Sequence, residues 1–169
     1  MRGAGTPAPL AVSELLAAAG SRTVRAMSAE VRIPIRWRDV DAYGHVNNAV
    51  FLNYLEEARD RLVESLFGAD AWDFVIARVA IDFRSELRQD DREVLVRCGI
   101  TGFGTSSVRT RELVHSSDGR LSAEAESVIV ARDPQAGRGR PLTDTERRIL
   151  QGAIESDDGM GIASEIGRD

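Results

Sequence analysis

Apolar and polar side chains alternate in the segment VRIPIRWR, residues 31–38. Val31, Ile33, Ile35 and Trp37 fall on one side of a period of two, which predicts a strand with one buried face. Pro34 has no N–H to donate to a neighbouring strand. We therefore expect this strand to lie at an edge of its sheet.

From Ala49 the apolar spacing changes to three and four residues, which predicts an amphipathic helix. The positions concerned are Phe51, Leu55, Ala58, Leu62 and Leu66. Their apolar sector is wide, so we expect the helix to lie in the core of the protein. Asn47 or Asn48 is suited to cap its start, and Gly68 is suited to end it.

Four further stretches alternate as strands do, and turn residues separate them. They cover residues 75–84, 94–100, 107–115 and 120–132. In the first of them, one face is predicted to hold Val75, Ala77, Val79, Ile81 and Phe83. A short helix is expected after Thr143. One strand, one helix and a four-strand meander predict an α+β fold. A single helix covers one face of such a sheet, so a second copy of the chain is the expected partner of the uncovered flank.

Length and composition fit one globular domain at residues 31–155. The chain has 169 residues, of which 43% are hydrophobic and 29% charged. We predict a flexible extension at residues 1–30, with translation starting at Met27, and a flexible tail at residues 156–169. The net charge of -5 argues against nucleic-acid binding, and no apolar run approaches the ~18 residues of a membrane span. The single cysteine, Cys98, favours a reducing, cytoplasmic location and a buried structural thiol.

Candidate chemistry lies in the polar segment before the helix, residues 39–48. Asp41 precedes a helix start, where backbone N–H groups lack partners and carry partial positive charge. Such N–H groups can polarise a carbonyl while a carboxylate attacks it or activates water, which is an acyl-transfer arrangement. Gly44 permits turn dihedrals and close approach of a ligand.

Two other interpretations of this segment compete with catalysis. Asp, Gly and Asn before a helix are also ordinary turn and capping residues. The spacing of Asp39, Asp41 and His45 resembles a metal site, but no further His or Cys cluster supports one. We therefore expect neither a metal nor a cofactor.

The segment RWRDVDAYGHVNNAVFLNYLEEAR, residues 36–59, resembles the signature of hotdog-fold thioesterases of the 4-hydroxybenzoyl-CoA thioesterase type. Its HVNN element is also similar to acyl-acyl-carrier-protein thioesterases. The likeness continues through the strands of residues 79–133 and the ending RPLTDTERRIL. It implies a hotdog fold, a five-stranded antiparallel sheet wrapped around one central helix, with a short C-terminal helix.

The resemblance also implies an active site. The catalytic carboxylate of the family falls on Asp41, the carbonyl-polarising N–H near Asn48, and the family glycine on Gly44. His45 and Asn47 match the HVNN subgroup, in which they line the site. Further substrate contacts are expected from Tyr43, and from three residues that would meet the coenzyme A end of the substrate: Ser106, Arg84 and Arg88.

The implied function is hydrolysis of acyl-CoA to a free acid and coenzyme A, which is part of the substrate. The resemblance further implies a homodimer or homotetramer with the acyl group between subunits. Two alternatives stay open at this point. The substrate is carried by acyl-carrier protein in lipid or polyketide synthesis, or the chain binds acyl thioesters without cleaving them.

Overall fold

The computed structural model describes residues 28–69 and 73–157. The proposed start at Met27 and residues 158–169 of the predicted tail lie outside these ranges. Within them the chain forms six strands, two α-helices and two short 3-10 helices. The strands are β1 (Ala29–Pro34), β2 (Phe74–Phe83), β3 (Glu93–Phe103), β4 (Ser107–Ser116), β5 (Leu121–Asp133) and β6 (Arg138–Gly139). The helices are η1 (Trp37–Asp39), α2 (Asn48–Phe67), η2 (Gln89–Asp91) and α3 (Asp144–Asp157).

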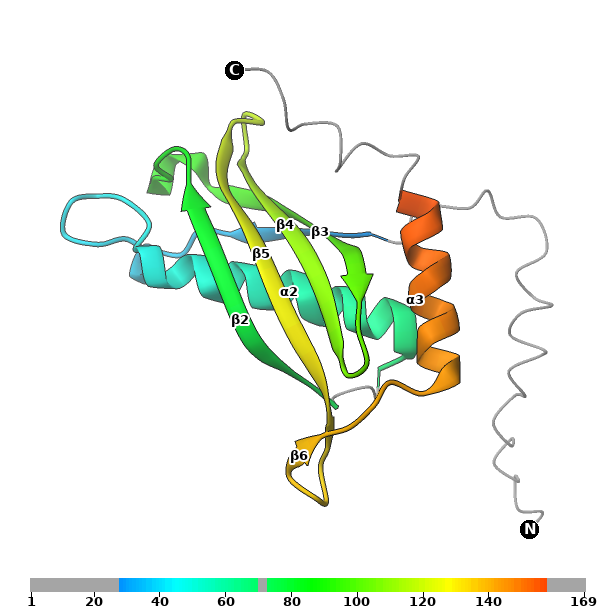
Figure 1. Cartoon of the computed structure of the whole chain (residues 1–169). Helices are drawn as coiled ribbons and strands as arrows, with labels where there is room; N and C mark the ends of the chain where they lie inside the picture. The colour runs from blue at the N-terminus through cyan, green and yellow to red at the C-terminus, as the bar shows by residue number, and fades with distance from the viewer. Residues whose placement is uncertain (1–27, 70–72, 158–169) are drawn as a thin grey trace, which may run out of the picture.

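The long strands form one antiparallel sheet in the order β1-β3-β4-β5-β2, and the two-residue β6 pairs with β5. The sheet curves around α2, which runs across its inner face (Figure 1). α3 lies beside the end of α2. This arrangement confirms the predicted hotdog fold, with its five main strands, central helix and C-terminal helix. β1 is an edge strand as expected. The predicted extent of this strand is wrong, because β1 ends at Pro34 and Trp37 lies in η1, where it is 86% exposed rather than buried.

The core lies between α2 and the inner face of the sheet. Tyr54, Leu55 and Leu62 of α2 are fully buried against strand residues such as Val96 and Val114. Both predicted ends of the helix are confirmed. The Asn47 side chain accepts a hydrogen bond from Ala49 N, and the helix ends at Gly68 with φ of 95°. Cys98 is a buried thiol, as predicted.

The predicted apolar face of β2 is wrong in its first half. A register shift lies between Ile76 and Arg78, so Ala77 has no partner in β5. Ile76 pairs with the buried Ile129, and Val79 pairs with the buried Ser127. Val75 therefore lies on the opposite face from Val79. A bulge adds one residue to one strand, and this reverses the alternation that a simple period of two assumes.

β2 is an edge strand of ten residues, and its outer side bears no strand in the described parts of the chain. Its apolar side chains stay accessible: Val75 is 43%, Ile76 49% and Phe83 48% exposed. A long, apolar edge of this kind is a template for pairing with another strand. In the described ranges, neither helix is long and apolar enough to cross a membrane.

Candidate active site

The polar loop between η1 and α2 is a closed turn. Val40 and Val46 form a bridge, Asp41 N donates to His45 O over 2.8 Å, and Gly44 N donates to Asp41 O over 3.1 Å. Gly44 has φ of 81°, which a residue with a Cβ rarely adopts. The turn therefore needs glycine at this position for backbone reasons alone.

The buried Asp39 side chain fixes the start of this turn to Arg36 and to α2. It is 3% exposed, and its carboxylate accepts hydrogen bonds from Arg36 N, from Arg36 Nε and from the Tyr54 hydroxyl. Burial alone would raise the pKa of Asp39, but the hydrogen bonds from Arg36 and Tyr54 and the guanidinium charge lower it overall. Asp39 is thus an ionised structural group that joins the loop to α2.

Asp41 uses one carboxylate oxygen within the loop. Oδ1 accepts the N–H of Tyr43 at 2.8 Å and the N–H of His45 at 3.2 Å. Oδ2 accepts no hydrogen bond from any residue that the structure describes. The side chain is therefore held in one orientation with one oxygen open, although it does not line any of the cavities described below.

The start of α2 offers an N–H group. The Asn47 side chain takes the Ala49 N–H at 2.9 Å, and the Asn47 carbonyl takes the Val50 N–H at 2.8 Å. The N–H of Asn48, the first of the helix, meets no acceptor among residues 28–69 and 73–157. It is the donor that the positive end of the helix dipole presents to a ligand.

Asn48 borders a cavity of about 250 Å³, here called the helix-start cavity. Its lining residues are His45, Val46, Asn48, Phe51, Phe83, Arg84, Ser85, Glu86 and Leu87. Phe51 and Phe83 meet edge to face, with ring centroids 5.1 Å apart, and form an apolar wall. The cavity thus joins an apolar surface to a hydrogen-bond donor at a helix start.

The His45 ring lies at the rim of this cavity. Its Nε2 is 3.0 Å from Glu86 Oε2 and 3.2 Å from Arg88 Nη2, and its backbone forms a bridge with Arg88. A hydrogen bond from Arg88, followed by the charges of Arg88 and His45, lowers the pKa of Glu86. Glu86 is the contact that sequence reasoning missed, because it lies 41 residues beyond His45 in a segment with no motif.

The structure gathers some of the predicted site residues and separates others. The loop and helix start hold Asp41, Gly44, His45, Asn47 and Asn48. Of these, His45 and Asn48 border the helix-start cavity, as Arg84 and Glu86 do. Tyr43 is 85% exposed. Ser106 immediately precedes β4, near the start of β2, and so lies at the other end of the sheet from Phe83.

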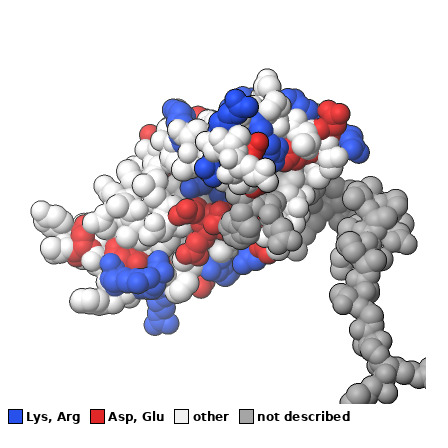
Figure 2. Space-filling view, turned by 90° about the horizontal axis from the view of Figure 1, so that it is seen from below, with Lys and Arg blue, Asp and Glu red and all other residues white. Residues whose placement is uncertain are grey.

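Arg84 and Arg88, the two predicted coenzyme A contacts near the helix-start cavity, are already paired with carboxylates. Arg84 bonds Glu124, and Arg88 lies 2.7 Å from Glu86. On the face shown in Figure 2, basic and acidic side chains are interspersed and form no single basic area. Among the described residues, no group of three or more His, Cys, Asp or Glu side chains is placed to hold a metal ion.

A curved antiparallel sheet around one helix, with a polar turn at the helix start, defines the hotdog class of proteins. The thioesterase-like superfamily model matches residues 35–149, so the chain belongs to this superfamily. This membership supports thioester hydrolysis as the general reaction. A search of the curated proteins finds no match.

Solved structures agree with this membership. A thioesterase from Thermus thermophilus, complexed with coenzyme A and Zn, is 34% identical with a TM-score of 0.67, covering 75% of this chain and 94% of that one. A predicted thioesterase from Bacillus stearothermophilus is 27% identical with a TM-score of 0.69, covering 75% and 96%. A Staphylococcus aureus protein in complex with CoA is 12% identical with a TM-score of 0.69, covering 80% and 89%, and shows likeness of fold alone.

Proposed function

We propose that this protein is an acyl-CoA thioesterase that uses Asp41 as general base or nucleophile. The observation that carries the proposal is that the loop before α2 and the first residue of α2 each hold an open group, Asp41 Oδ2 and the Asn48 N–H. A thioester carbonyl placed at the start of α2 would accept the Asn48 N–H. Its developing negative charge would be stabilised by that donor and by the helix dipole.

Asp41 supplies the attacking group in one of two ways. As a base, it takes a proton from water while the water oxygen bonds to the carbonyl carbon. As a nucleophile, Oδ2 itself bonds to that carbon, and water later cleaves the acyl-aspartyl anhydride. In both routes the carbon–sulfur bond breaks, the thiolate leaves with its electron pair, and a proton from water ends on the thiol.

Coenzyme A as the thiol component is supported by the 34% identical Thermus thermophilus thioesterase, which was solved with coenzyme A. Arg84 lines the helix-start cavity, and Arg88 contacts His45 at its rim. Both guanidinium groups suit phosphate. Their carboxylate partners, Glu124 and Glu86, would have to share them with a phosphate. His45 is assigned to the rim, where Glu86 orients its ring.

The proposed assembly is a homodimer through β2. Pairing two copies of this edge would cover Val75 and Ile76 and continue the sheet. Antiparallel pairing reverses direction, so the start of one β2 would face the end of the other. Ser106, which lies near the start of β2, would then approach the helix-start cavity of the partner, and this explains why it is distant within one chain.

Replacing Asp41 with Asn tests the catalytic assignment, because the amide oxygen can still accept the Tyr43 and His45 N–H groups. We expect thiol release from acyl-CoA to fall by about 10²-fold or more, with the dimer and the unfolding midpoint unchanged. Asp90→Asn, at an exposed carboxylate of η2, is the control. Parent-rate turnover by Asp41→Asn would refute the role of Asp41.

Matched acyl-CoA and acyl-carrier-protein thioesters, from short to long and including aromatic acyl groups, identify the donor. Faster release from the carrier protein would replace coenzyme A in this proposal. Tight acyl-CoA binding with no thiol release from either donor would show a binding protein instead.

A further inference from the structure

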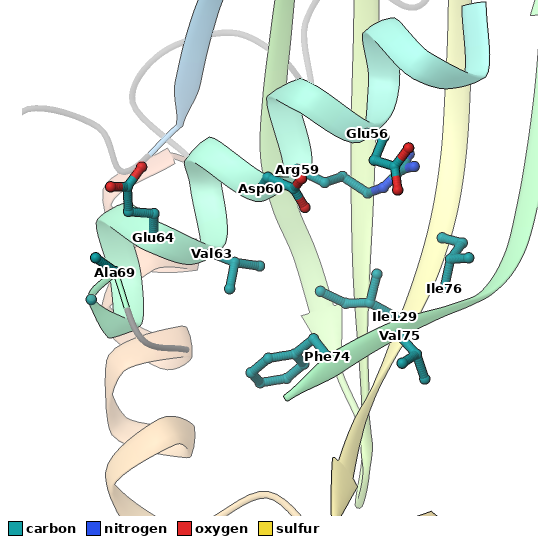
Figure 3. Close-up of a pocket in the computed structure, with 11 residues that line it drawn as sticks. Glu56, Arg59, Asp60, Val63, Glu64, Ala69, Phe74, Val75, Ile76 and Ile129 are labelled. Carbon is teal, nitrogen blue, oxygen red and sulfur yellow. The ribbon is translucent and has the colours of Figure 1, made fainter. Parts of the chain in front are cut away.

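A second cavity lies between the second half of α2 and the first half of β2. Its volume is about 320 Å³ (Figure 3). Its apolar lining comes from Phe74, Ile76 and Ile129 of the sheet and from Val63 of α2. α2 also contributes charged residues, among them Glu56, Arg59 and Asp60. We call this space the Arg59 cavity.

Arg59 is an unusual lining residue because it is buried. It is 7% exposed, and its side chain extends from α2 toward the sheet (Figure 3). Nη1 donates to Glu112 Oε1 at 3.3 Å and to Ser127 Oγ at 3.2 Å. Nε and Nη2 donate to no residue within the described ranges. The guanidinium is therefore fixed on one edge and available on the other.

Glu112 is the buried carboxylate that binds the Arg59 guanidinium. It is 0% exposed on the inner face of β4, where an apolar residue is the usual choice. Its carboxylate also accepts hydrogen bonds from Thr110 at 2.8 Å and Ser127 at 3.2 Å. Replacing a buried carboxylate–guanidinium pair with hydrocarbon side chains is often neutral or stabilising, so this pair is weak evidence of a stabilising role.

The mouth of the cavity is acidic. Glu56 and Asp60 lie one turn apart on α2, and both border the cavity. Burial, and next the charge of Glu56, raise the pKa of Asp60. An incoming carboxylate would be repelled here, whereas a neutral oxygen can pass and accept a hydrogen bond from Arg59.

We propose that the Arg59 cavity binds the distal end of the acyl group and selects acyl groups that carry a neutral oxygen there, a carbonyl or a hydroxyl. A plain hydrocarbon end would leave the guanidinium edge unsolvated and unpaired, and a terminal carboxylate would meet Glu56 and Asp60. The inference rests on the proposed function and on its dimer, in which the start of one β2 faces the helix-start cavity of the partner.

The test compares one medium-chain acyl-CoA with the same chain bearing an oxo or hydroxyl group near its end, and with a terminal carboxylate. We expect kcat/KM to be about tenfold higher for the oxygenated chains than for the plain one, and lowest for the carboxylate. Non-hydrolysable thioether analogues of the same acyl-CoAs give Kd values in parallel.

The double variant Arg59→Met with Glu112→Gln removes the guanidinium without leaving a buried unpaired carboxylate. In it, the ratio of kcat/KM between oxygenated and plain chains should fall to about one. The matched control is Arg97→Met with Glu30→Gln, an exposed pair 3.1 Å apart, which should keep the parent ratio.

Equal kcat/KM and equal Kd for plain and oxygenated chains in the parent protein would overturn this inference while leaving the thioesterase proposal intact. A ratio that survives in the Arg59 double variant would also overturn it. Absence of thiol release from every acyl-CoA, with tighter binding of oxygenated thioethers, would refute the proposed function but support the selectivity of the cavity.

Discussion

The Tyr54 hydroxyl donates a 3.0 Å hydrogen bond to Asp39 Oδ2, and both side chains are almost completely buried. This bond ties the second turn of α2 to the residue that begins the polar loop. Asn47 N in turn donates to Asp39 O at 2.9 Å. The position of the start of α2 relative to the loop therefore depends on the buried contacts of Asp39 with Tyr54 and Asn47.

Removing the Tyr54 hydroxyl should cost stability. Tyr54→Phe removes the hydroxyl donor from Asp39 Oδ2, which keeps its hydrogen bonds from Arg36 N and Arg36 Nε. Because the lost bond is to a buried, charged carboxylate, we expect a loss of about 1–3 kcal/mol in the free energy of unfolding. Urea unfolding measures it. Tyr43→Phe removes the same hydroxyl from a side chain that is 85% exposed, and it should leave stability unchanged. Equal midpoints for the two variants would show that the Asp39 contact contributes nothing.

Asp39 should make stability depend on acid pH. The pKa of Asp39 is lowered in the folded protein despite burial. The contribution of Asp39 to the free energy of unfolding is therefore complete above its unfolded pKa of about 3.9. That contribution is lost as the pH falls through the lower pKa of the folded protein. Asp39→Asn should therefore be less stable than the parent at neutral pH, with the difference shrinking below about pH 4. Urea unfolding across pH tests this, and a constant difference would contradict it.

Any side chain at Gly44 should lower the stability of the protein, although there is space for a Cβ. A Cβ at this position meets nothing within 4 Å, so the cost of Gly44→Ala comes from its φ of 81° alone. We expect a loss of about 1–2 kcal/mol in the free energy of unfolding. Gly152→Ala, inside α3 and also with nothing within 4 Å, should instead stabilise the protein by about 0.5–1 kcal/mol. Thermal unfolding of both variants should show shifts of opposite sign.

The cap of α2 should matter for both stability and turnover. Asn47→Ala removes the acceptor of the Ala49 N–H and should cost about 0.5–2 kcal/mol in the free energy of unfolding. It should also lower kcat, because the adjacent Asn48 N–H loses its fixed direction. Asn47→Asp keeps an acceptor and should restore stability. A variant that loses stability but keeps the parent kcat would separate the cap from catalysis.

Mixed dimers should report whether two chains build one site. Asp41→Asn removes the proposed catalytic carboxylate, and Ile76→Trp fills the Arg59 cavity, so each variant alone should be nearly inactive. Random exchange makes half of the dimers mixed, each with one intact site, so about a quarter of the parent activity should return. Size-exclusion chromatography checks the dimer. If mixing restores no activity, each chain contains its whole site.

Local patterns in the sequence determined much of this protein. Periods of two and of 3.6 predicted the strands and α2, because each reports which face of a single element is buried. Asn47, Gly44 and Gly68 were recognisable as cap and turn residues because their effects act within a few positions. The resemblance placed Asp41 and Asn48 at one helix start, and the fold brings that segment together.

Only the tertiary structure decided which distant groups meet. His45 lies against Glu86 and Arg88, and Arg59 lies against Glu112, 53 residues further along the chain. The bulge at Ala77 exchanged the two faces of β2. Periodicity cannot reveal these contacts, because it carries no information on the register between strands or on which buried polar group faces another. That register is set by the packing of the whole sheet around α2.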